Sequence, residues 1–476
     1  GLGDVYKRQY LRRIIMFDKN FLWGTASSSY QIEGAFTEDG KGVSIWDTFS
    51  NKPGNIAHNE NGNEACDHYH RYREDIALMK SLSIQAYRFS ISWTRIFPDG
   101  IVKDSDGNVH FNKAGLDFYD NIVNCCLENG IEPFITLYHW DLPQALEDNG
   151  GWLNRQTAYI FADYAEFICE HFSDRVVNIA TINEPQIISG LGYMNGLHAP
   201  GKKLDCISVL SVIHHLALAH GLAITRMRAV AKQPIKTGFS STGDLCFPAS
   251  ECDEDIDAAR AESFKIVTGN MTFNHTIFCD MTCLGRYPDI AGTGLHLEKG
   301  LEKIGHYKEL PFVKDGDSEL MHQPIDFLGI NVYNGHEVSV TGHIKKKPGS
   351  PRTALGWPVT PGVMNYGIRY MYERYNLPIY IFEDGLACND IISLDGKVHD
   401  SNRIDFLTRY LTDLEKAYKA GVPILGYFHW SFTDNFEWHS GYDPRFGLIY
   451  VDYETQQRIP KDSAYWYSDL IKKSCN

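Results

Sequence analysis

The stretch of sequence that decides the fold is FNKAGLDFYDNIVNCCLENGIEPFITLYHW, residues 111–140. Its first two thirds have the periodicity of an amphipathic helix, which Asn112 is suited to cap and Gly130 to end. The residues predicted to share one helix face are Leu116, Tyr119, Val123 and Cys126. An apolar run at 131–140 follows without a linker and predicts a buried strand. A helix that leads directly into a strand is typical of parallel α/β folds.

Seven further runs of this kind lie on either side of that stretch. They are FLWGTASSSYQIEG (21–34), AYRFSISW (86–93), VVNIATINEP (176–185), IKTGFSSTG (235–243), IDFLGINVYN (325–334), LPIYIFEDG (377–385) and ILGYFHWSFTDN (424–435). Only polar insertions at 202–208, 250–261 and 341–352 interrupt the pattern, without a Gly/Ser linker. We therefore predict an α/β fold in one domain, a closed (β/α)8 TIM barrel with loop insertions at its C-terminal face. A doubly wound sheet with a second domain is disfavoured.

Composition narrows the class of protein. The chain has 476 residues, 43% of them hydrophobic, with 45 basic against 60 acidic residues and a net charge of −15. This charge disfavours nucleic acid and anionic membranes as partners. We find no apolar window long enough to span a membrane and no signal-peptide core, so we expect an intracellular, cytoplasmic protein. The 11 cysteines are an odd number without framework spacing, which indicates reduced thiols. The sequence leaves open a homo-oligomer.

The N-terminus differs from the rest of the chain. Residues 1–15 read GLGDVYKRQYLRRII, and the segment DVYKRQ resembles a reading frame of a transposon-derived sequencing adaptor. We expect residues 1–15 to be a non-native or disordered extension, natural translation to start at Met16, and residues 16–476 to form the barrel domain.

Polar residues gather where the predicted strands end. They are Gln31, Glu33, Arg88, His139, Asn183, Glu184, Asn331, Tyr333, Glu383 and Trp430. In a parallel barrel these ends lie on one face, where active sites of this fold form. Two of the glutamates among them, Glu184 and Glu383, end the fourth and seventh predicted strands.

Each glutamate alone could be a solvated loop residue or a helix cap. Two observations favour chemistry instead. Pro185 stiffens the turn that carries Glu184, and tryptophans accumulate near the predicted crevice at 140, 357, 430 and 438. Facing carboxylates in an aromatic cleft suit glycoside hydrolysis. A proton-sharing pair of the aspartic-protease kind would give no reason for the tryptophans.

Several longer motifs now point to one family. They are FLWGTASSSYQIEGA, YRFSISWTRI, YHWDLP, TINEP, NVYN, WSFTDNFEW and RFG, in that order. From about Phe21 to Tyr467 the chain therefore resembles glycoside hydrolase family 1, the β-glucosidase family of retaining (β/α)8 enzymes. The resemblance implies a small β-glycoside substrate and neither cofactor nor metal.

The resemblance also implies catalytic roles. Glu184 would be the general acid/base and Glu383 the nucleophile, with Arg88 and Tyr333 beside Glu383 and Asn183 at the sugar 2-hydroxyl. Burial and the charge of Glu383 should raise the pKa of Glu184. For retention, the two carboxyl groups should lie about 5 to 5.5 Å apart.

The same resemblance implies the substrate-binding residues. They are Gln31, His139, Trp140, Asn331, Trp357, Trp430, Glu437, Trp438 and Phe446. Trp430 would be the platform below the sugar and Trp357 an aglycone platform, unless Trp357 is a packed loop residue. The phospho-sugar branch has Ser where this chain has Glu437, and Lys and Tyr where it has Pro444 and Phe446. We therefore expect an unphosphorylated sugar.

One residue departs from the family pattern: Asp384 stands where the family usually has Asn. Neighbouring strand residues point to opposite sides, so Asp384 should face away from the sugar. We expect its charge to raise the pKa of Glu383 somewhat and to alter the acidic limb of the pH profile.

Other motifs lack the spacing of a site. His68 and His70 are two residues apart on a predicted helix, and HHLALAH (214–220) lacks the four-residue gap of a metal pair. Cys279 and Cys283 lack a second ligand pair for zinc, and GLGYMNG (190–196) lacks the dinucleotide fingerprint.

We therefore predict a retaining β-glucosidase acting on non-reducing terminal β-D-glucosyl residues of small glucosides or cello-oligosaccharides. The alternatives are β-galactosidase, β-fucosidase or β-mannosidase preference, a transglycosylase, or a catalytically silent sugar-binding barrel.

Overall fold

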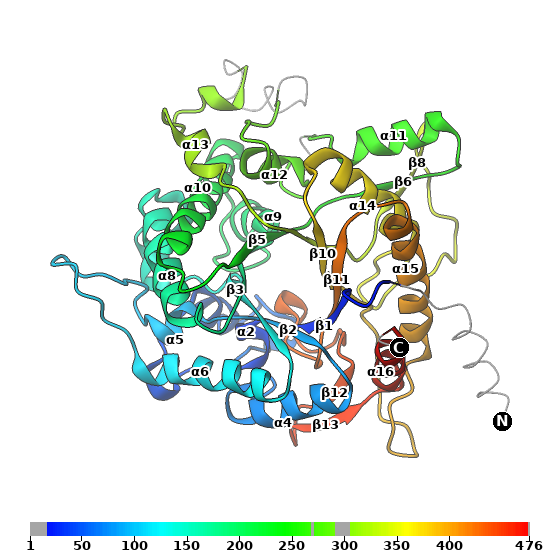
Figure 1. Cartoon of the computed structure of the whole chain (residues 1–476), viewed down its shortest axis with the longest axis horizontal. Helices are drawn as coiled ribbons and strands as arrows, with labels where there is room; N and C mark the ends of the chain where they lie inside the picture. The colour runs from blue at the N-terminus through cyan, green and yellow to red at the C-terminus, as the bar shows by residue number, and fades with distance from the viewer. Residues whose placement is uncertain (1–16, 268–270, 291–304, 475–476) are drawn as a thin grey trace.

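The computed structural model describes residues 17–267, 271–290 and 305–474. Eight parallel strands follow one another around a closed barrel in chain order (Figure 1). They are β1 (Leu22–Ala26), β2 (Ala86–Ser90), β3 (Glu132–Tyr138), β4 (Asn178–Asn183), β5 (Lys236–Ser241), β7 (Leu328–Asn331), β10 (Ile379–Asp384) and β11 (Ile424–Trp430). β1 pairs with β11 and closes the ring. The predicted fold is confirmed, and each predicted run supplies one strand. The predictions for residues 1–15 and Met16 lie outside the described residues.

Helices form the outer layer around the strands (Figure 1). The longer ones are α4 (His68–Ser81), α6 (Lys113–Glu128), α8 (Gln156–Phe172), α10 (Cys206–Val230), α11 (Asp253–Ser263), α12 (Thr276–Cys283), α14 (Gly362–Tyr375), α15 (Ser401–Lys419) and α16 (Asp462–Ser474). The shorter ones are α2 (Ser29–Ile32), η1 (Glu38–Gly40), α3 (Ile45–Ser50), η2 (Ala57–Asn59), α5 (Trp93–Ile96), α7 (Gln144–Asp148), η3 (Gly151–Leu153), α9 (Pro185–Ile187), η4 (Ile188–Met194), η7 (Tyr307–Glu309), α13 (Asp317–Met321) and η8 (Trp438–Ser440).

The helix α6 has the buried face predicted from its periodicity. Leu116, Tyr119, Val123 and Cys126 are all buried. Asn112 occupies the N-cap position, but its side chain accepts no bond from the helix. The amide instead donates to the carbonyls of Asp39 and Arg95, at 2.7 and 2.9 Å. Gly130 follows the helix end with a φ of +69°, a conformation that glycine adopts without strain.

The expectation that no apolar window could span a membrane is wrong for α10. This helix is long and apolar enough to cross a membrane by length and composition, although 83% of its apolar window is buried inside the protein. It packs against α8 on one side and against α12 and α13 on others. Because neighbours cover most of its circumference, α10 is apolar nearly all round.

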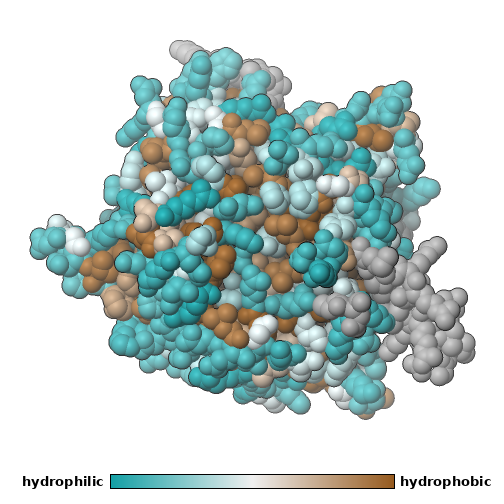
Figure 2. All heavy atoms as spheres, in the orientation of Figure 1, coloured by the Kyte–Doolittle hydropathy of each residue, from teal (hydrophilic) through white to brown (hydrophobic). Residues whose placement is uncertain are grey.

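The insertions follow the carboxyl ends of strands, as predicted. After β5 and β7 the chain forms a small sheet from β6 (Cys246–Pro248), β8 (His336–Ser339) and β9 (Gly342–His343). After β11 it forms a hairpin from β12 (Ile449–Asp452) and β13 (Gln457–Pro460). Figure 2 shows hydrophilic residues over much of the viewed face, with hydrophobic ones gathered toward the middle, over the barrel strands.

Candidate active site

Both glutamates lie at strand ends and are buried, with exposed fractions of 5% for Glu184 and 3% for Glu383. Glu383 is held from two sides. Its Oε1 accepts from Nη1 of Arg88 on β2 at 2.7 Å, and its Oε2 accepts from the Tyr333 hydroxyl at 2.8 Å. One carboxylate therefore has a cation and a strong donor in direct contact, which favour its charged form.

Two asparagines join this carboxylate to Glu184. Asn331 donates from Nδ2 to Oε1 of Glu184 at 2.9 Å and to Oδ1 of Asn183 at 3.2 Å. It also forms a side-chain hydrogen bond with Glu383. Arg88 donates to the same Asn183 oxygen at 2.6 Å. The structure therefore brings the two glutamates together around shared partners, while their predicted separation stays a prediction.

The two carboxyl groups differ in proton affinity. Burial, then the negative charge of Glu383, raises the pKa of Glu184 to about 8. Burial also raises the pKa of Glu383, but the Arg88 charge and the bonds from Arg88 and Tyr333 oppose the rise. Glu184 consequently keeps its proton to higher pH than Glu383, because the cation contacts Glu383 directly.

A second set of predicted residues surrounds Glu437. Gln31 donates from Nε2 to the Phe436 carbonyl at 2.9 Å and to Oε2 of Glu437 at 3.4 Å. The Trp430 side chain also bonds Glu437. Burial and the charge of Glu383 raise the pKa of Glu437 to about 8. Since Glu383 acts on it electrostatically, Glu437 belongs to the same site.

His139 connects these two sets. Its Nε2 lies 3.1 Å from Nδ2 of Asn183, so Nε2 accepts and the proton sits on Nδ1. That buried Nδ1 has no hydrogen-bond partner among the described residues. Burial, then the Arg88 charge, holds the pKa of His139 well below its usual range. His139 is thus neutral and has a free donor for a ligand.

Aromatic side chains enclose the site. The His139 ring lies near Trp430 and Trp438, with centroids 5.8 and 5.9 Å apart. The Trp140 indole donates to the Asn183 carbonyl at 2.8 Å and lies 4.5 Å from the Trp438 ring. Trp140 therefore supports the backbone of a site residue.

Trp357 lies on a wall made of three segments, 353–357, 386–388 and 445–446. Its ring packs 5.4 Å from Tyr333 and 6.2 Å from Phe446. Ala354 donates to the Ala387 carbonyl at 2.9 Å, and Cys388 bridges Arg445. The wall connects Trp357 to the chain that follows Glu383.

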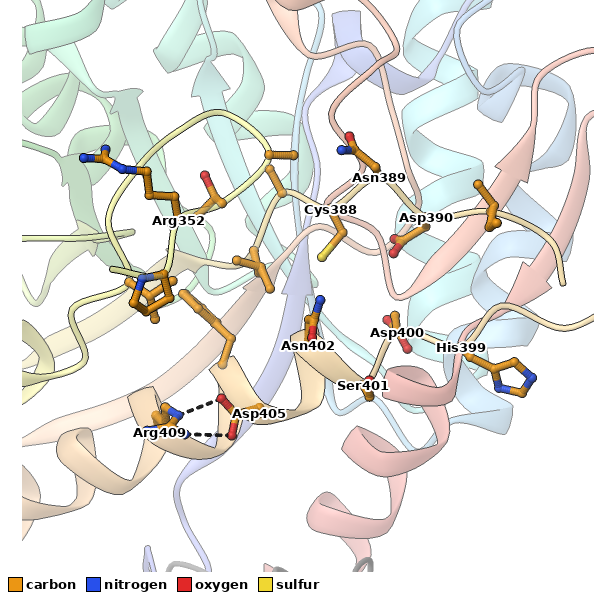
Figure 3. A pocket seen from close by; sticks show the side chains of 18 of the residues that line it. Arg352, Cys388, Asn389, Asp390, His399, Asp400, Ser401, Asn402, Asp405 and Arg409 are labelled. Carbon is orange, nitrogen blue, oxygen red and sulfur yellow. Dashed lines mark hydrogen bonds and ion pairs between the residues drawn. The ribbon is translucent and has the colours of Figure 1, made fainter. Parts of the chain in front are cut away.

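A cavity of about 790 Å³ lies beside this wall. It is lined by residues of 351–361, of the loop after β10 and of the start of α15. Figure 3 shows Cys388 and Asn402 pointing toward each other within it. Neither Glu184 nor Glu383 lines this cavity. The site is therefore located by its buried polar network rather than by cavity size.

Asp384, predicted to face away from the sugar, contacts the neighbouring strand β11. It is fully buried, and its Oδ2 accepts from the Tyr427 hydroxyl on β11 at 2.8 Å. Burial raises the pKa of Asp384 well above its usual range. A raised pKa favours the neutral carboxyl group, and the causes that shift the pKa of Glu383 are burial, Arg88, Tyr333 and Asn331 rather than Asp384. The effect expected from a charge at Asp384 therefore has no support in the structure.

Sequence reasoning missed two contacts of the site. Thr242 forms a side-chain hydrogen bond with Glu184, and Asn435 accepts from Gln31 Nε2 at 3.0 Å. Both lie at the ends of predicted runs, so position alone was the available signal. Among the predicted structural residues, His68 is buried against Asp75 at 2.7 Å. In the described ranges no cluster of three or more His, Cys, Asp or Glu could hold a metal.

Comparison with known proteins gives the family. The protein-family model described as "Glycosyl hydrolase family 1" matches residues 14–475. The chain belongs to glycosyl hydrolase family 1. Beta-glucosidase A of Thermotoga maritima is 43% identical over 465 residues, which cover 96% of this chain and 98% of that protein. A bifunctional beta-D-glucosidase/beta-D-fucosidase of Bifidobacterium breve is 40% identical, with 96% and 98% covered.

Solved structures agree with this membership. The Thermotoga maritima beta-glucosidase in complex with glucoimidazole superposes with a TM-score of 0.84 at 42% identity, covering 96% of this chain and 99% of that one. Family 1 enzymes are retaining, so this member is a retaining glycoside hydrolase with a (β/α)8 barrel. The resemblance stated from the motifs is confirmed.

Proposed function

We propose that this family 1 enzyme is a β-glucosidase that removes non-reducing terminal β-D-glucosyl residues from small glucosides or cello-oligosaccharides. The observation that carries the proposal is the asymmetry between two buried glutamates. Glu383 contacts Arg88 and Tyr333, whereas the pKa of Glu184 is raised to about 8. A retaining mechanism needs this pair of one charged and one protonated carboxyl group.

In the first step, an oxygen of Glu383 attacks the anomeric carbon while Glu184 gives its proton to the departing glycosidic oxygen. The product is an α-glycosyl-enzyme ester and a free aglycone. Ester formation removes the charge of Glu383, which lowers the pKa of Glu184. Glu184, now a carboxylate, takes a proton from water, and that water attacks the same carbon and releases β-glucose. Asn183 binds the 2-hydroxyl, where a bond that tightens in the transition state increases the rate.

The sugar hydroxyls are bound by the polar set around Glu437. Gln31 and Glu437 offer an amide and a carboxyl group, and the free Nδ1 proton of His139 donates to a third hydroxyl. Trp430 and Trp438 supply flat apolar surfaces for the sugar ring. Glu437 and its partner Gln31 offer no cation to a 6-phosphate, and the carboxyl group would repel one when ionised, which favours an unphosphorylated sugar. Trp357, Phe446 and Tyr333 pack together where the aglycone would lie.

The relatives support glucose as the preferred sugar and leave fucose as the best-supported alternative. One is a beta-glucosidase, and another is bifunctional toward beta-D-glucosides and beta-D-fucosides. Galactosidase or mannosidase preference and net transglycosylation have no specific observation in their favour. A silent sugar-binding barrel is disfavoured because both glutamates are present and buried. We place the enzyme inside the cell, since the ten described cysteines are free thiols.

Azide rescue tests the two roles separately. Glu383→Ala with azide and 2,4-dinitrophenyl β-glucoside should give α-glucosyl azide, because azide attacks from the face that Glu383 left. Glu184→Ala with the same reagents should give β-glucosyl azide, because azide attacks the glycosyl-enzyme ester. Proton NMR of the anomeric position distinguishes the products. Absence of both azides from folded variants would contradict the assignment, and wild-type rate ratios on gluco-, galacto-, fuco- and mannosides settle the sugar.

A further inference from the structure

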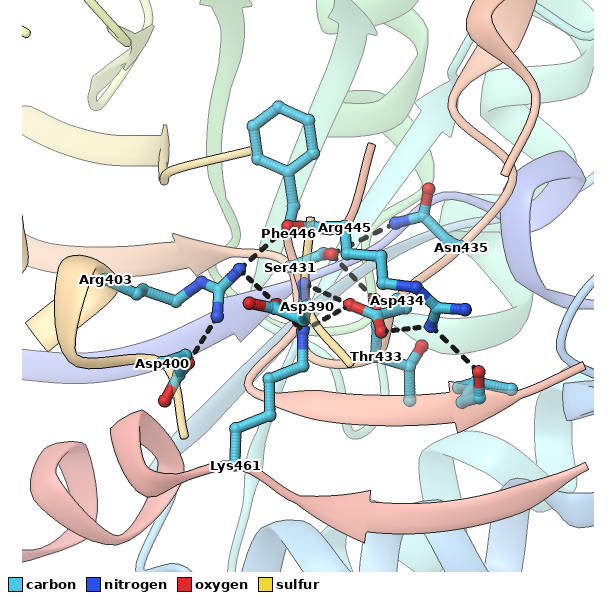
Figure 4. A network of polar contacts seen from close by, with 12 residues as sticks. Asp390, Asp400, Arg403, Ser431, Thr433, Asp434, Asn435, Arg445, Phe446 and Lys461 are labelled. Atoms are coloured by element: carbon cyan, nitrogen blue, oxygen red, sulfur yellow. Dashed lines mark hydrogen bonds and ion pairs between the residues drawn. The ribbon is translucent and has the colours of Figure 1, made fainter. Parts of the chain in front are cut away.

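A buried ion network joins the loops that follow β10 and β11. Its cations are Arg403, Arg445 and Lys461, and its anions are Asp390, Asp400 and Asp434. Figure 4 shows the side chains of these six residues gathered in one network of polar contacts. Three positive and three negative charges balance, which makes such a buried cluster tolerable.

Lys461 is the member that connects the two halves. Its ammonium is fully buried and donates to Oδ2 of Asp390 and to Oδ1 of Asp434, both at 2.6 Å. Asp390 also accepts from Arg403 at 2.8 Å, and Asp434 accepts from Arg445 at 2.7 Å. Each aspartate therefore has its own arginine, and the lysine bonds both aspartates together.

The half that contains Asp390 belongs to the chain that follows the nucleophile. Arg403 donates to the carbonyl of Leu386, three residues after Glu383, at 3.2 Å. It also donates to the carbonyl of Arg445 at 2.8 Å. The wall beside Glu383 is thus fixed from outside by this half.

The half that contains Asp434 belongs to the sugar-binding loop. Asp434 directly precedes Asn435, whose side chain accepts from Gln31 and donates to Oγ of Ser431 at 3.0 Å. Gln31 in turn donates to Glu437. A displacement of Asp434 would therefore move the group that binds the sugar hydroxyls.

We propose that Lys461 is a positioning residue that sets the spacing between the Glu383 strand and the loop that carries Asn435 and Glu437. This inference rests on the proposed function. Lys461 itself touches none of the reacting atoms. It acts by holding the attacking carboxylate and the sugar-binding loop at a fixed distance from each other. Misplacement of a reacting group by about 1 Å can lower a rate on the order of a hundredfold.

The decisive variant removes the connection without leaving a charge unpaired. In Lys461→Met/Asp390→Asn, Arg403 keeps Asp400 and Arg445 keeps Asp434, so the protein should fold. We expect kcat/KM for 4-nitrophenyl β-glucoside to fall about tenfold or more, with a lower kcat as well as a higher KM. The ratio of the glucoside rate to the fucoside rate should also change, because a displaced Glu437 would no longer bind the sugar hydroxyls correctly. Asp390→Asn alone should show a smaller loss in the same direction.

Arg155→Met is the matched control. Arg155 pairs with buried Asp317, with Nη1 2.8 Å from Oδ2, and contacts none of the described site residues named above. It should lower the unfolding temperature and leave kcat/KM and the sugar ratio unchanged. A folded double variant that behaves kinetically like this control would overturn the proposal.

Two measurements separate this proposal from the proposed function. If the wild type turns over no β-glycoside, the proposed function fails, and glucose binding by calorimetry still reports on the sugar loop. Weaker glucose binding by the double variant supports positioning, and equal binding contradicts it. If the wild type is active and the double variant matches it, only the positioning role fails.

Discussion

Tyr333 donates its hydroxyl proton to Oε2 of Glu383 over 2.8 Å. This bond stabilises the charged carboxylate, and a second bond fixes the donor, since the Tyr410 hydroxyl donates to the Tyr333 carbonyl at 3.0 Å. Tyr333→Phe should lower kcat/KM about 10- to 100-fold, because a hydrogen bond to a charged group contributes about 1.5–3 kcal/mol. The acidic limb of the pH profile should move to higher pH.

Tyr164→Phe is the control for that prediction. It removes another buried hydroxyl, which donates to the Leu137 carbonyl at 3.1 Å, away from the carboxylates. Equal losses in both variants would show that the effect of Tyr333 is only structural.

The raised pKa of Glu184 predicts where the pH–rate profile falls on its basic side. Because its pKa is raised to about 8, kcat/KM for an aryl glucoside with a poor leaving group should fall as the pH rises through about 8. A 2,4-dinitrophenyl glucoside needs no proton on leaving, so its profile should lack that limb. In Glu383→Gln the negative neighbour is gone, and titration of Glu184 by NMR should give a lower pKa. An identical basic limb for both leaving groups would contradict the assignment.

Asp384→Asn should stabilise the protein as the pH rises. The folded pKa of Asp384 lies well above the unfolded value of about 3.8, so the unfolded chain ionises first and wild-type stability falls above that pH. The variant avoids this loss, so its free energy of unfolding should exceed that of the wild type near neutral pH and match it near pH 4. Its acidic limb of activity should match the wild type. A gain at pH 4 equal to that at pH 8, or a shifted limb, would count against a protonated Asp384.

Trp357→Ala distinguishes an aglycone platform from a packed loop residue. If Trp357 holds the aglycone, KM for cellobiose and aryl glucosides should rise up to about tenfold, consistent with aromatic contacts of about 0.5–1.5 kcal/mol. Inhibition by glucose, which occupies only the sugar subsite, should be unchanged. A lower unfolding temperature with unchanged KM would favour the packed-residue interpretation.

The fold was predictable because its determinants are local. Each barrel strand is a short apolar run, and the buried face of α6 follows from spacing alone. The hydrogen-bond partners of Asn112 could not be predicted, since Asp39 and Arg95 belong to other segments of the chain. The same limit explains α10, whose apolar surface is understandable only once α8, α12 and α13 are in place.

The candidate site was predictable as far as strand ends determine it. Glu184, Glu383 and Asn331 lie at the carboxyl ends of parallel strands, which a barrel brings to one face, whereas Arg88 lies in the middle of β2. The raised pKa of Asp384 could not be predicted, because it results from burial by other segments, which outweighs the opposing hydrogen bond from Tyr427 of the neighbouring strand. The partners of Lys461 were also hidden, since its two aspartates are 71 and 27 residues away in the chain.

The pairing of β1 with β11 has a consequence during synthesis. Ala26 pairs with Trp430, so one edge of the first strand stays unpaired until the last barrel strand has been synthesised. Until then, a nascent chain leaving the ribosome presents an unpaired edge made of Leu22–Ala26, and such edges invite pairing with other chains. Release of a truncated polypeptide would leave that edge open permanently, which makes incomplete products of this gene candidates for aggregation and chaperone capture.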